Sequence, residues 1–306
     1  MKMNGIIPIY KGRGMTSTDC VFKCRKIFKM RRIGHSGTLD PNVDGVLPIC
    51  VGKATKVVNY LMDSGKVYIG EITLGFSTTT EDLDGETVEK RALLKPFTSE
   101  EINDKMRELT GDLVQIPPMY SAIKVKGRRL YDYARAGDPV ERPKRNIHIE
   151  YFKQTKTTIF NQESGYQKIY FEVGCGKGTY IRTLAVDLGK KLGVPAVMSD
   201  LSRLSSGGFT VGQTIKISEL AQAAEDGSLE SRLYPVDYAL QKYFHVELDE
   251  QQWKIVKNGG FLLPSEISDT KIVKQIVLMY RDEARCIYRY NEDEKRYQPE
   301  QMIDLT

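Results

Sequence analysis

The sequence predicts an α+β fold, because segments typical of helices and of strands follow one another without the regular strand–helix–strand repeat of a doubly wound sheet. The chain has 306 residues, which suffices for one large domain and a smaller one. Hydrophobic residues make up 41% of it and charged residues 28%, as in ordinary globular proteins. No apolar run approaches the ~18 residues that a membrane-spanning helix needs, so no membrane association is expected.

The amino-terminal third supplies the first elements. Thr16 or Ser17 can cap a helix whose apolar positions recur at helical spacing, whereas glycines and a proline interrupt every period in the segment that follows it. Of the two strands expected next, the second is rich in β-branched and aromatic residues. In chain order we expect a strand at 5–10, a helix through Phe28, a loop at 31–45, a strand at 46–51, a short helix at 53–62 and a strand at 66–74.

The remaining elements define two domains. Thr98 and Glu101 can form a capping box at the start of a helix. We expect a main domain over residues 1–243 and a small β-rich domain over 244–306, which at about 60 residues folds only marginally alone and therefore packs on the rest. The elements expected are a helix to Leu109, strands at 147–160 and 166–174, a helix at 179–192, a strand at 197–204, a helix around Trp253, and strands at 271–280 and 284–290.

Positive charge is concentrated in two stretches of the chain. The net charge is only +5, yet residues 1–35 carry nine Lys and Arg against one acidic residue, Asp19, and residues 119–148 carry eight against three. The rest of the chain is therefore acidic. Such segregation favours surfaces that bind a polyanion over a general role in solubility.

Residues 115–145 differ in kind from the segments around them. Four prolines and two glycines break every helical or strand period, and tyrosines alternate with basic residues. We interpret this segment as an arm inserted into the core.

Several kinds of site are excluded by residue types and spacing. The five cysteines form no C-x-x-C pair and the three histidines show no zinc-ligand spacing, so neither a disulfide framework nor a metal site is expected. No glycine-rich phosphate loop occurs, and no cofactor is expected. The amino terminus lacks a signal-peptide pattern, which makes the cytoplasm the expected compartment.

The most informative stretch is residues 34–41, GHSGTLDP, which is followed by GVLP at 45–48. A glycine-rich loop that holds one carboxylate, Asp40, is typical of a site where something approaches the backbone closely. Together the two stretches closely resemble the signature of the TruB family of tRNA pseudouridine synthases. Four more stretches resemble motifs of this family: KGRGMTS at 11–17, LGFSTTTEDLDG at 74–85, QIPPMYSAIKVKGRRLY at 115–131 and CGKGTYIR at 175–182.

The resemblance implies a mixed, largely antiparallel β-sheet catalytic core flanked by helices, an RNA-gripping arm at 115–145 and a small β-rich, PUA-like carboxy-terminal domain that binds RNA. It also implies that Asp40 is the nucleophile, that Arg182 keeps the carboxylate of Asp40 charged, and that Tyr68 stacks on the target base and moves a proton. The substrate-binding residues that it implies are Lys11, His35, Tyr68, Lys124, Arg128, Arg129, Tyr180 and Leu201.

Two positions depart from the family's pattern. Gly12 stands where proline is usual, and Asp44 stands where threonine is common. Asp44 places a second carboxylate four residues from Asp40, from which a glycosidase pair could be argued. We expect a structural or solvated Asp44 instead.

The sequence thus predicts a cytoplasmic, monomeric enzyme that isomerises the T-loop uridine of tRNA, at position 55, to pseudouridine without a metal, a cofactor or a guide RNA. Attack of Asp40 at the sugar C1′, attack at C6 of the base and assisted loss of the base all remain open. So do two other functions. One is a catalytically idle RNA-binding or tRNA-folding protein, and the other is an acyl hydrolase that uses Ser121 and Lys124 of an S-x-x-K pattern.

Overall fold

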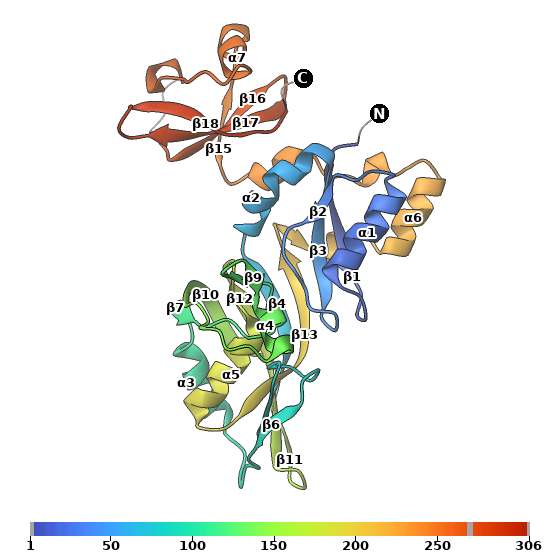
Figure 1. The fold of residues 1–306 in the computed structure, drawn as a ribbon, viewed down its shortest axis with the longest axis vertical. Coiled ribbons are helices and arrows are strands. Elements are labelled where there is room, and N and C mark those ends of the chain that lie inside the picture. Colours follow the sequence, from blue (N-terminus) through green and yellow to red (C-terminus); the bar gives the residue numbers. More distant parts are fainter. Residues whose placement is uncertain (1–2, 268–271, 305–306) are drawn as a thin grey trace. The chain divides into compact units, whose positions relative to one another are not determined.

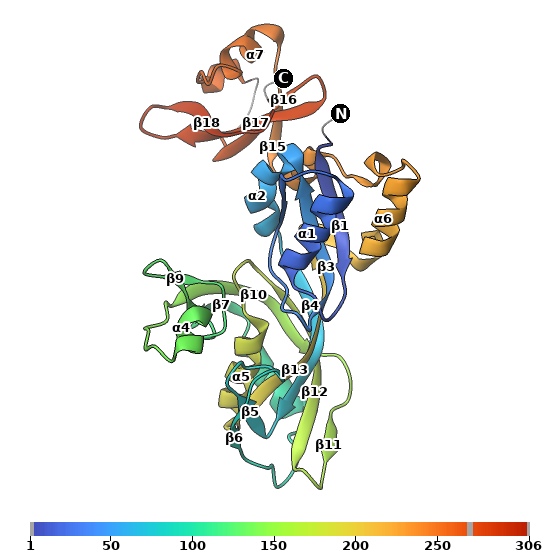
Figure 2. The same ribbon diagram turned by 45° about the vertical axis from the view of Figure 1, so that its right-hand side comes forward.

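The computed structural model describes residues 3–267 and 272–304 and has the predicted α+β fold, with mainly antiparallel sheets and flanking helices (Figures 1 and 2). The chain forms two compact units. Unit 1 comprises Met1–Asn42, Val46–Asp63 and Gly207–Thr306, and unit 2 comprises Val43–Gly45 and Ser64–Ser206. The domain boundary at residue 244 stays a prediction. None of the helices in the described ranges is long and apolar enough to cross a membrane.

The amino-terminal part of unit 1 packs α1 against β-structure. Thr16 caps α1 as predicted, since its side chain accepts a hydrogen bond from the N–H of Asp19 while the Asp19 carboxylate accepts one from the N–H of Thr16. The segment predicted as a loop contains one short strand, β2. The elements are β1 (Gly5–Lys11), α1 (Ser17–Ile27), β2 (Ile33–His35), β3 (Asp44–Val51), the 3-10 helix η1 (Gly52–Val57), α2 (Val58–Met62), β14 (Phe209–Thr210), η2 (Val211–Gln213), α6 (Ile217–Glu225), η3 (Glu230–Arg232) and η4 (Val236–Leu240).

The carboxy-terminal part of unit 1 is a four-stranded sheet in the order β15-β16-β17-β18, in which only the β15–β16 pair is parallel. The predicted helix around Trp253 and the two predicted strands are present, except that Lys271 lies outside the described residues. The sequence did not indicate the edge strands β15 and β18. The elements are β15 (Phe244–Glu247), α7 (Glu250–Val256), η5 (Pro264–Glu266), β16 (Gln275–Tyr280), β17 (Glu283–Asn291) and β18 (Arg296–Met302).

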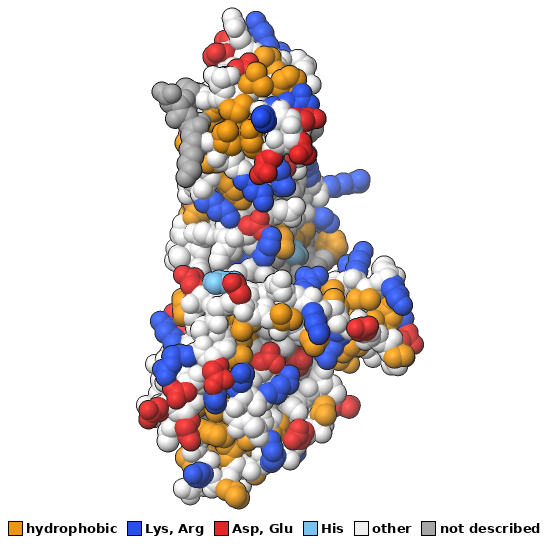
Figure 3. Space-filling view, turned by 90° about the vertical axis from the view of Figure 1, so that its left-hand side faces the viewer, with side chains coloured by type: hydrophobic (Ala, Val, Ile, Leu, Met, Phe, Trp, Pro, Cys, Tyr) orange, Lys and Arg blue, Asp and Glu red, His pale blue; other side chains and the backbone are white. Residues whose placement is uncertain are grey.

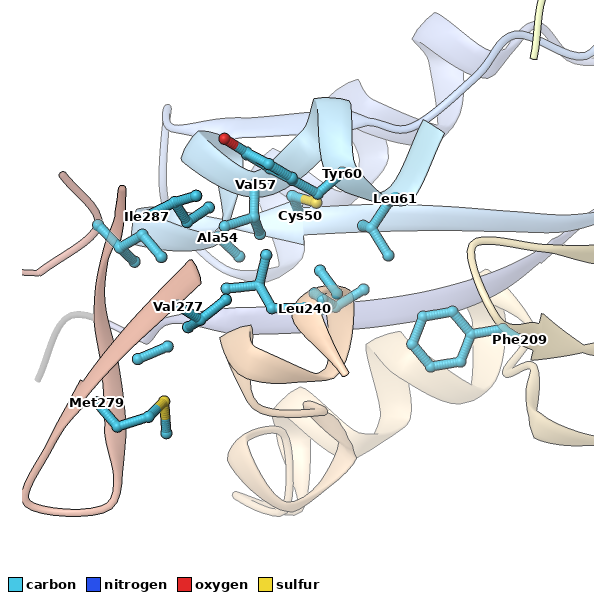
Figure 4. Close-up of a cluster of buried hydrophobic side chains, with 14 of the residues drawn as sticks. Cys50, Ala54, Val57, Tyr60, Leu61, Phe209, Leu240, Val277, Met279 and Ile287 are labelled. Atoms are coloured by element: carbon cyan, nitrogen blue, oxygen red, sulfur yellow. The ribbon is translucent and has the colours of Figure 1, made fainter. Parts of the chain in front are cut away.

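This small sheet shares a hydrophobic core with the rest of unit 1 (Figure 4). Val57 of η1, Leu61 of α2 and Leu240 of η4 are buried in one cluster with Val277 of β16 and Ile287 of β17. Burial of a side chain of this size contributes roughly 1.5–3 kcal/mol. This shared core stabilises the small sheet. It confirms the expectation that so small an element packs on the rest of the chain.

Unit 2 is built on an antiparallel sheet in the order β13-β4-β12-β10-β7. The strand predicted at 147–160 is in fact two strands, β10 and β11, because the chain turns between them. The elements are β4 (Lys66–Leu74), β5 (Phe76–Thr78), β6 (Thr87–Lys90), α3 (Ser99–Arg107), β7 (Gly111–Gln115), β8 (Lys124–Val125), β9 (Arg128–Arg129), α4 (Leu130–Ala136), β10 (Arg145–Gln154), β11 (Ile159–Asn161), β12 (Tyr166–Cys175), α5 (Ile181–Leu192) and β13 (Ala196–Ser206).

The arm, residues 115–145, is an excursion between two neighbouring strands. It leaves the sheet at Gln115, the last residue of β7, and returns at Arg145, the first residue of β10, and these two residues are paired with each other. Between them the chain forms the β8–β9 hairpin and α4. The predicted insertion is therefore confirmed, and its two ends are fixed by the sheet.

Glu300 on β18 makes a polar link between the carboxy-terminal sheet and α2. Its carboxylate accepts hydrogen bonds from the Arg289 guanidinium at 2.8 and 2.9 Å, from the Gln275 amide at 2.8 Å and from the Tyr60 hydroxyl at 3.2 Å. The bonds from Arg289 are the main reason that the pKa of Glu300 is lower than usual, although burial opposes them.

A carboxyl group whose pKa is lower in the folded state than in the unfolded state contributes stability at neutral pH, and this contribution is lost as the pH falls through the folded-state pKa. Because Glu300 is partly exposed to solvent, we predict that Glu300→Gln lowers the free energy of unfolding by only about 1 kcal/mol near pH 7 and by less near pH 3. Urea denaturation at both pH values tests this, with Glu292→Gln as the control, since the Glu292 side chain makes no hydrogen bond or ion pair among the described residues. An equal loss at both pH values would contradict the prediction.

Candidate active site

Asp40 lies in the tight loop that joins β2 to β3. These strands are antiparallel, with His35 opposite Ile49, so residues 36–43 reverse the direction of the chain. Gly37 has a φ of 132°, which favours glycine, and its N–H donates to Nδ1 of His35 at 3.3 Å. His35 thus holds the first turn of the loop, and its predicted contact with substrate stays a prediction.

The residues on either side of Asp40 are held by Lys11, the last residue of β1, and by Ser17, the first residue of α1. Nζ of Lys11 donates to the carbonyl of Pro41 at 3.1 Å and to that of Gly12 at 3.0 Å. On the other side, Oγ of Ser17 accepts the N–H of Leu39 at 2.8 Å and donates to the carbonyl of Leu39 at 3.1 Å. Two stretches that the sequence singled out separately, 11–17 and 34–41, therefore form one structure around Asp40.

Lys11 is completely buried. An ammonium group inside a protein is costly unless hydrogen bonds compensate for its lost hydration. The carbonyls of Gly12 and Pro41 supply such bonds. Lys11, which we expected to bind substrate, thus lies where it supports the backbone of the Asp40 loop, and its contact with substrate stays a prediction.

Arg182, in the first turn of α5, is also buried. Its guanidinium donates to the carbonyl of Thr80 at 2.9 Å and to the carbonyl of Tyr120 at 2.9 Å, and it lies 3.7 Å from Oδ2 of Asp82. Thr80 and Asp82 belong to the predicted motif at 74–85, and Tyr120 belongs to the arm. One arginine therefore joins three stretches that are far apart in the sequence.

The backbone of Tyr180 is fixed by the first residue of the arm. The Gln115 side chain accepts the N–H of Tyr180 at 2.8 Å and donates to its carbonyl at 3.1 Å. Gln115 is buried, so both bonds form away from water. The arm's base and the start of α5, where Tyr180 and Arg182 lie, are therefore one rigid polar network.

Tyr68 and Leu201 share one face of the sheet. On β4 and β13, Leu201 pairs with Gly70 and Arg203 pairs with Tyr68, and directly opposed residues of antiparallel strands point to the same side. Both predicted site residues are buried, at 7% and 5% exposure. A Cβ at Gly70 would lie 2.4 Å from the Asp200 carbonyl oxygen, so only glycine allows this close strand approach.

The predicted site residues thus fall into groups. Lys11, His35 and Asp40 belong to unit 1, where Lys11 and the Asp40 loop are in contact. In unit 2, β4 and β13 bring Tyr68 and Leu201 to one face, while α5 carries Arg182 and follows directly on Tyr180. The arm holds the three remaining residues, Lys124, Arg128 and Arg129.

Asp44 has a structural contact, as expected. Its Oδ1 accepts a hydrogen bond from the hydroxyl of Ser202, and Asp44 and Gly45 pair in parallel with Ser202 and Arg203 of β13. A Cβ at Gly45, which has a φ of 114°, would lie 2.2 Å from the Arg203 carbonyl oxygen. The first residues of β3 therefore fit against β13 only because position 45 is glycine.

The three cations predicted on the arm differ in their surroundings. Arg128 is bound inside the arm, because its guanidinium contacts the Asp138 carboxylate and the Asp132 carbonyl and stacks 4.5 Å from the centre of the Tyr133 ring. Lys124 and Arg129 are exposed. On the face that Figure 3 shows, Lys and Arg side chains lie among acidic and apolar ones and form no single continuous patch.

Ser121 does not have the surroundings of a nucleophile activated by lysine. Its Oγ is buried and makes no hydrogen bond with any described residue. Lys124, the other residue of the S-x-x-K pattern, is exposed on β8. A serine nucleophile needs a base within hydrogen-bond reach, so this geometry does not support an acyl hydrolase.

Sequence reasoning missed three residues that hold these networks together. Ser17 was considered only as a helix cap, and Gln115 was one polar residue in a matched stretch. Glu81 was not considered, yet its carboxylate accepts a hydrogen bond from Oγ1 of Thr183 at 2.7 Å, and burial raises its pKa. The one sequence feature that could have pointed to these three residues is their position inside or beside the matched motifs.

Comparison with known proteins agrees with these motifs. Residues 25–181 match the model of the TruB family pseudouridylate synthase (N terminal domain), and residues 182–241 match that of the tRNA pseudouridylate synthase B C-terminal domain. The chain is 62% identical over 304 residues to tRNA pseudouridine synthase B of Ligilactobacillus salivarius, which covers 99% of this chain and 100% of that protein. It is 54% identical over 306 residues to tRNA pseudouridine synthase B of Lactiplantibacillus plantarum, with coverage of 99% and 100%.

Solved structures show the same fold. The structure resembles a chain in the crystal structure of a Cbf5-Nop10-Gar1 complex with a TM-score of 0.72 and 26% identity, over 98% of this chain and 84% of that one. A chain of the archaeal box H/ACA sRNP Nop10-Cbf5 complex is similar in fold, with a TM-score of 0.72, 22% identity and coverage of 99% and 87%. From the family models, the relatives and the shared motifs, the chain belongs to the TruB family of pseudouridine synthases.

Proposed function

We propose that this pseudouridine synthase isomerises the T-loop uridine of tRNA, at position 55, with Asp40 as the nucleophile. The relatives' name, tRNA pseudouridine synthase B, supports tRNA as the substrate. The observation that carries the role of Asp40 is the support of its loop from both sides, by Ser17 at Leu39 and by Lys11 at Pro41. Such preorganisation of one carboxylate is what a nucleophile requires.

The reaction breaks the bond between C1′ and N1 and joins C1′ to C5 of the same base. It is neutral in redox terms and transfers no external group, so the proposal needs no cofactor and no metal. An ionised Asp40 attacks C1′ or C6, or assists loss of the base. The family resemblance implies that Arg182 keeps that carboxylate charged, since a guanidinium that contacts a carboxyl group favours its ionised form.

The other site residues would hold the base outside the RNA stack. Extrusion of a base costs a few kcal/mol, which stacking and backbone contacts must offset. Tyr68 and Leu201 lie on one face of the sheet and would offer an aromatic and an aliphatic surface to the base. His35 and Tyr180 would contact the nucleotide around it.

The arm would supply the contacts to the RNA backbone of the T arm. Lys124, Lys126 and Arg129 are exposed there, and the guanidiniums of Arg129 and Arg135 lie 5.5 and 5.4 Å from the centre of the Tyr131 ring. Cations close to an aromatic ring suit RNA. With its own arm the enzyme would act as a cytoplasmic monomer without a guide RNA.

The alternative of a catalytically idle RNA-binding protein makes a distinct prediction for Asp40. Asp40→Asn keeps the shape of the side chain but removes its charge and nucleophilicity, so we expect kcat to fall by more than 100-fold, or at least ~2.7 kcal/mol in barrier. The affinity for tRNA should stay within a few fold. Single-turnover assays on an unmodified tRNA transcript, with pseudouridine mapped at position 55, measure both effects.

Asp44→Asn is the matched control, because an amide can still bond to Ser202. It should retain most of the activity. If Asp40→Asn keeps more than a tenth of kcat, Asp40 is not the nucleophile and the idle-protein alternative gains support.

The arm's role can be tested through the salt dependence of binding. Replacement of Lys124, Lys126 and Arg129 by Ala should weaken tRNA binding and flatten the log–log salt slope by ~0.7–0.9 for each lost phosphate contact. Arg128 is left intact because it holds the arm together.

A variant with the same charge change, Lys90, Lys95 and Lys156 to Ala, removes exposed cations elsewhere in unit 2 and should bind normally. Filter binding at several salt concentrations compares the two variants. Equal slopes would mean that the arm does not grip RNA.

Support of the Asp40 loop by Ser17 gives a further prediction. Ser17→Ala leaves the buried N–H of Leu39 without its partner, which costs about 1–3 kcal/mol of stability. Because Leu39 precedes Asp40, kcat should fall more than KM rises. Thr18→Ala, at the exposed next position, should change neither. A normal kcat in a destabilised Ser17→Ala enzyme would show that the support matters for folding alone.

A further inference from the structure

The first basic stretch of the sequence is not accounted for by the arm or by the Asp40 loop. Residues 22–32, from α1 to the start of β2, contain six Lys and Arg and no Asp or Glu. The other side of α1, with Cys20, Val21 and Cys24, is buried in the core. The exposed cations therefore lie on the outward side of α1 and in the turn after it.

Most of these cations have no acidic partner. Lys26, Lys29 and Arg31 are exposed, and none of them has an ion pair or a hydrogen bond from its side chain among the described residues. Lys23 is exposed as well, but it interacts electrostatically with Asp19, four residues earlier on α1. Elsewhere in unit 1, Lys53 pairs with Asp304. Unneutralised charge of one sign over a short surface attracts polyanions.

One aromatic side chain stands among the cations. Phe22 is 52% exposed, and the Arg25 guanidinium lies 5.5 Å from the centre of its ring. Exposed aromatic rings bordered by cations stack on nucleic-acid bases. A membrane surface is less suited, because an interfacial helix inserts a whole apolar face, and that face of α1 is already buried.

Lys29 occupies a backbone conformation that glycine usually takes. It has a φ of 51°, directly after the helix, and the N–H of Met30 donates to the carbonyl of Arg25 at 3.1 Å while that of Lys29 donates to Lys26 at 3.3 Å. These bonds form the helix-ending motif in which glycine is preferred. The backbone conformation at this position therefore favours glycine over lysine, and only the charge of the Lys29 side chain, at the carboxy-terminal end of the helix, is favourable there.

We propose that the α1 basic surface, formed by Phe22, Lys23, Lys26, Lys29 and Arg31, binds the backbone of the RNA substrate as a second contact area besides the arm. The inference rests on the proposed function for the identity of that RNA. It accounts for the missing acidic partners, the exposed ring and the unfavoured lysine together. The α1 basic surface would also let unit 1, which carries the Asp40 loop, contact the RNA directly.

Lys29→Gly is the sharpest test, because binding and stability should move in opposite directions. Glycine relieves the left-handed backbone, so the melting temperature should stay equal or rise, whereas a purely structural Lys29 would make the variant less stable. At the same time the affinity for unmodified tRNA should fall, and the salt slope should drop by ~0.7–0.9 for one lost phosphate contact.

A triple variant, Lys26→Ala, Lys29→Gly and Arg31→Ala, should amplify the effect on the slope to that of up to three lost phosphate contacts. The triple Lys90, Lys95 and Lys156 variant again serves as the charge-matched control. Affinity and slope equal to those of the control would overturn the proposal. Loss of binding to vesicles containing phosphatidylserine, with tRNA binding intact, would also overturn it and assign the surface to lipid.

Failure of this inference can be told apart from failure of the proposed function. Mapping of pseudouridine in tRNA treated with the unaltered enzyme reports on the proposed function alone. The salt slope of the α1 variants reports on the α1 basic surface alone, because it is measured as binding and needs no turnover.

Discussion

The site depends first on how two buried polar groups fix the backbone around Asp40. The Lys11 ammonium binds the carbonyl after Asp40, and the Ser17 hydroxyl binds both backbone groups of the residue before it. A buried ammonium and a buried hydroxyl are costly unless hydrogen-bonded, so the bonds that position the loop are also bonds that the fold requires. Folding and preorganisation of the carboxylate are therefore one process, and the loop has little freedom to relax away from its geometry.

The same principle ties the arm to the residues at the start of α5. Gln115 holds the backbone of Tyr180, and Arg182 binds the carbonyl of Tyr120. The arm's two ends are paired in the sheet. Its base is therefore rigid, while its exposed cations lie on the short hairpin and helix beyond. A movement of the arm that breaks the Tyr120 contact would leave a buried guanidinium short of one acceptor, so the arm's position and that of Arg182 are energetically coupled.

Much of the fold could be predicted because local signals were strong. The Thr16 and Thr98 capping boxes fixed two helix starts, and β-branched runs located β3 and β4. Edge strands β15 and β18 were missed because β15 has only four residues, whereas β18 has seven but is mostly polar and contains a proline. The residue types of the site followed from motifs, yet their supports did not: Gln115 and Glu81 act through partners, Tyr180 and Thr183, that only the tertiary structure brings to them.

The basic residues also fall into two groups. Some make contacts that support the fold, and others remain available to bind a ligand. Arg128 and Arg289 are each bound to a carboxylate, and removing either would first weaken the arm or the carboxy-terminal sheet. Lys26, Lys29 and Lys124 make no such bonds among the described residues. Cations held near one another without acids raise each other's electrostatic energy, and a polyanion relieves that cost on binding. In the free protein, the unpaired cations of α1 and those of the arm therefore repel their neighbours. Relief of this repulsion would contribute part of the free energy of RNA binding.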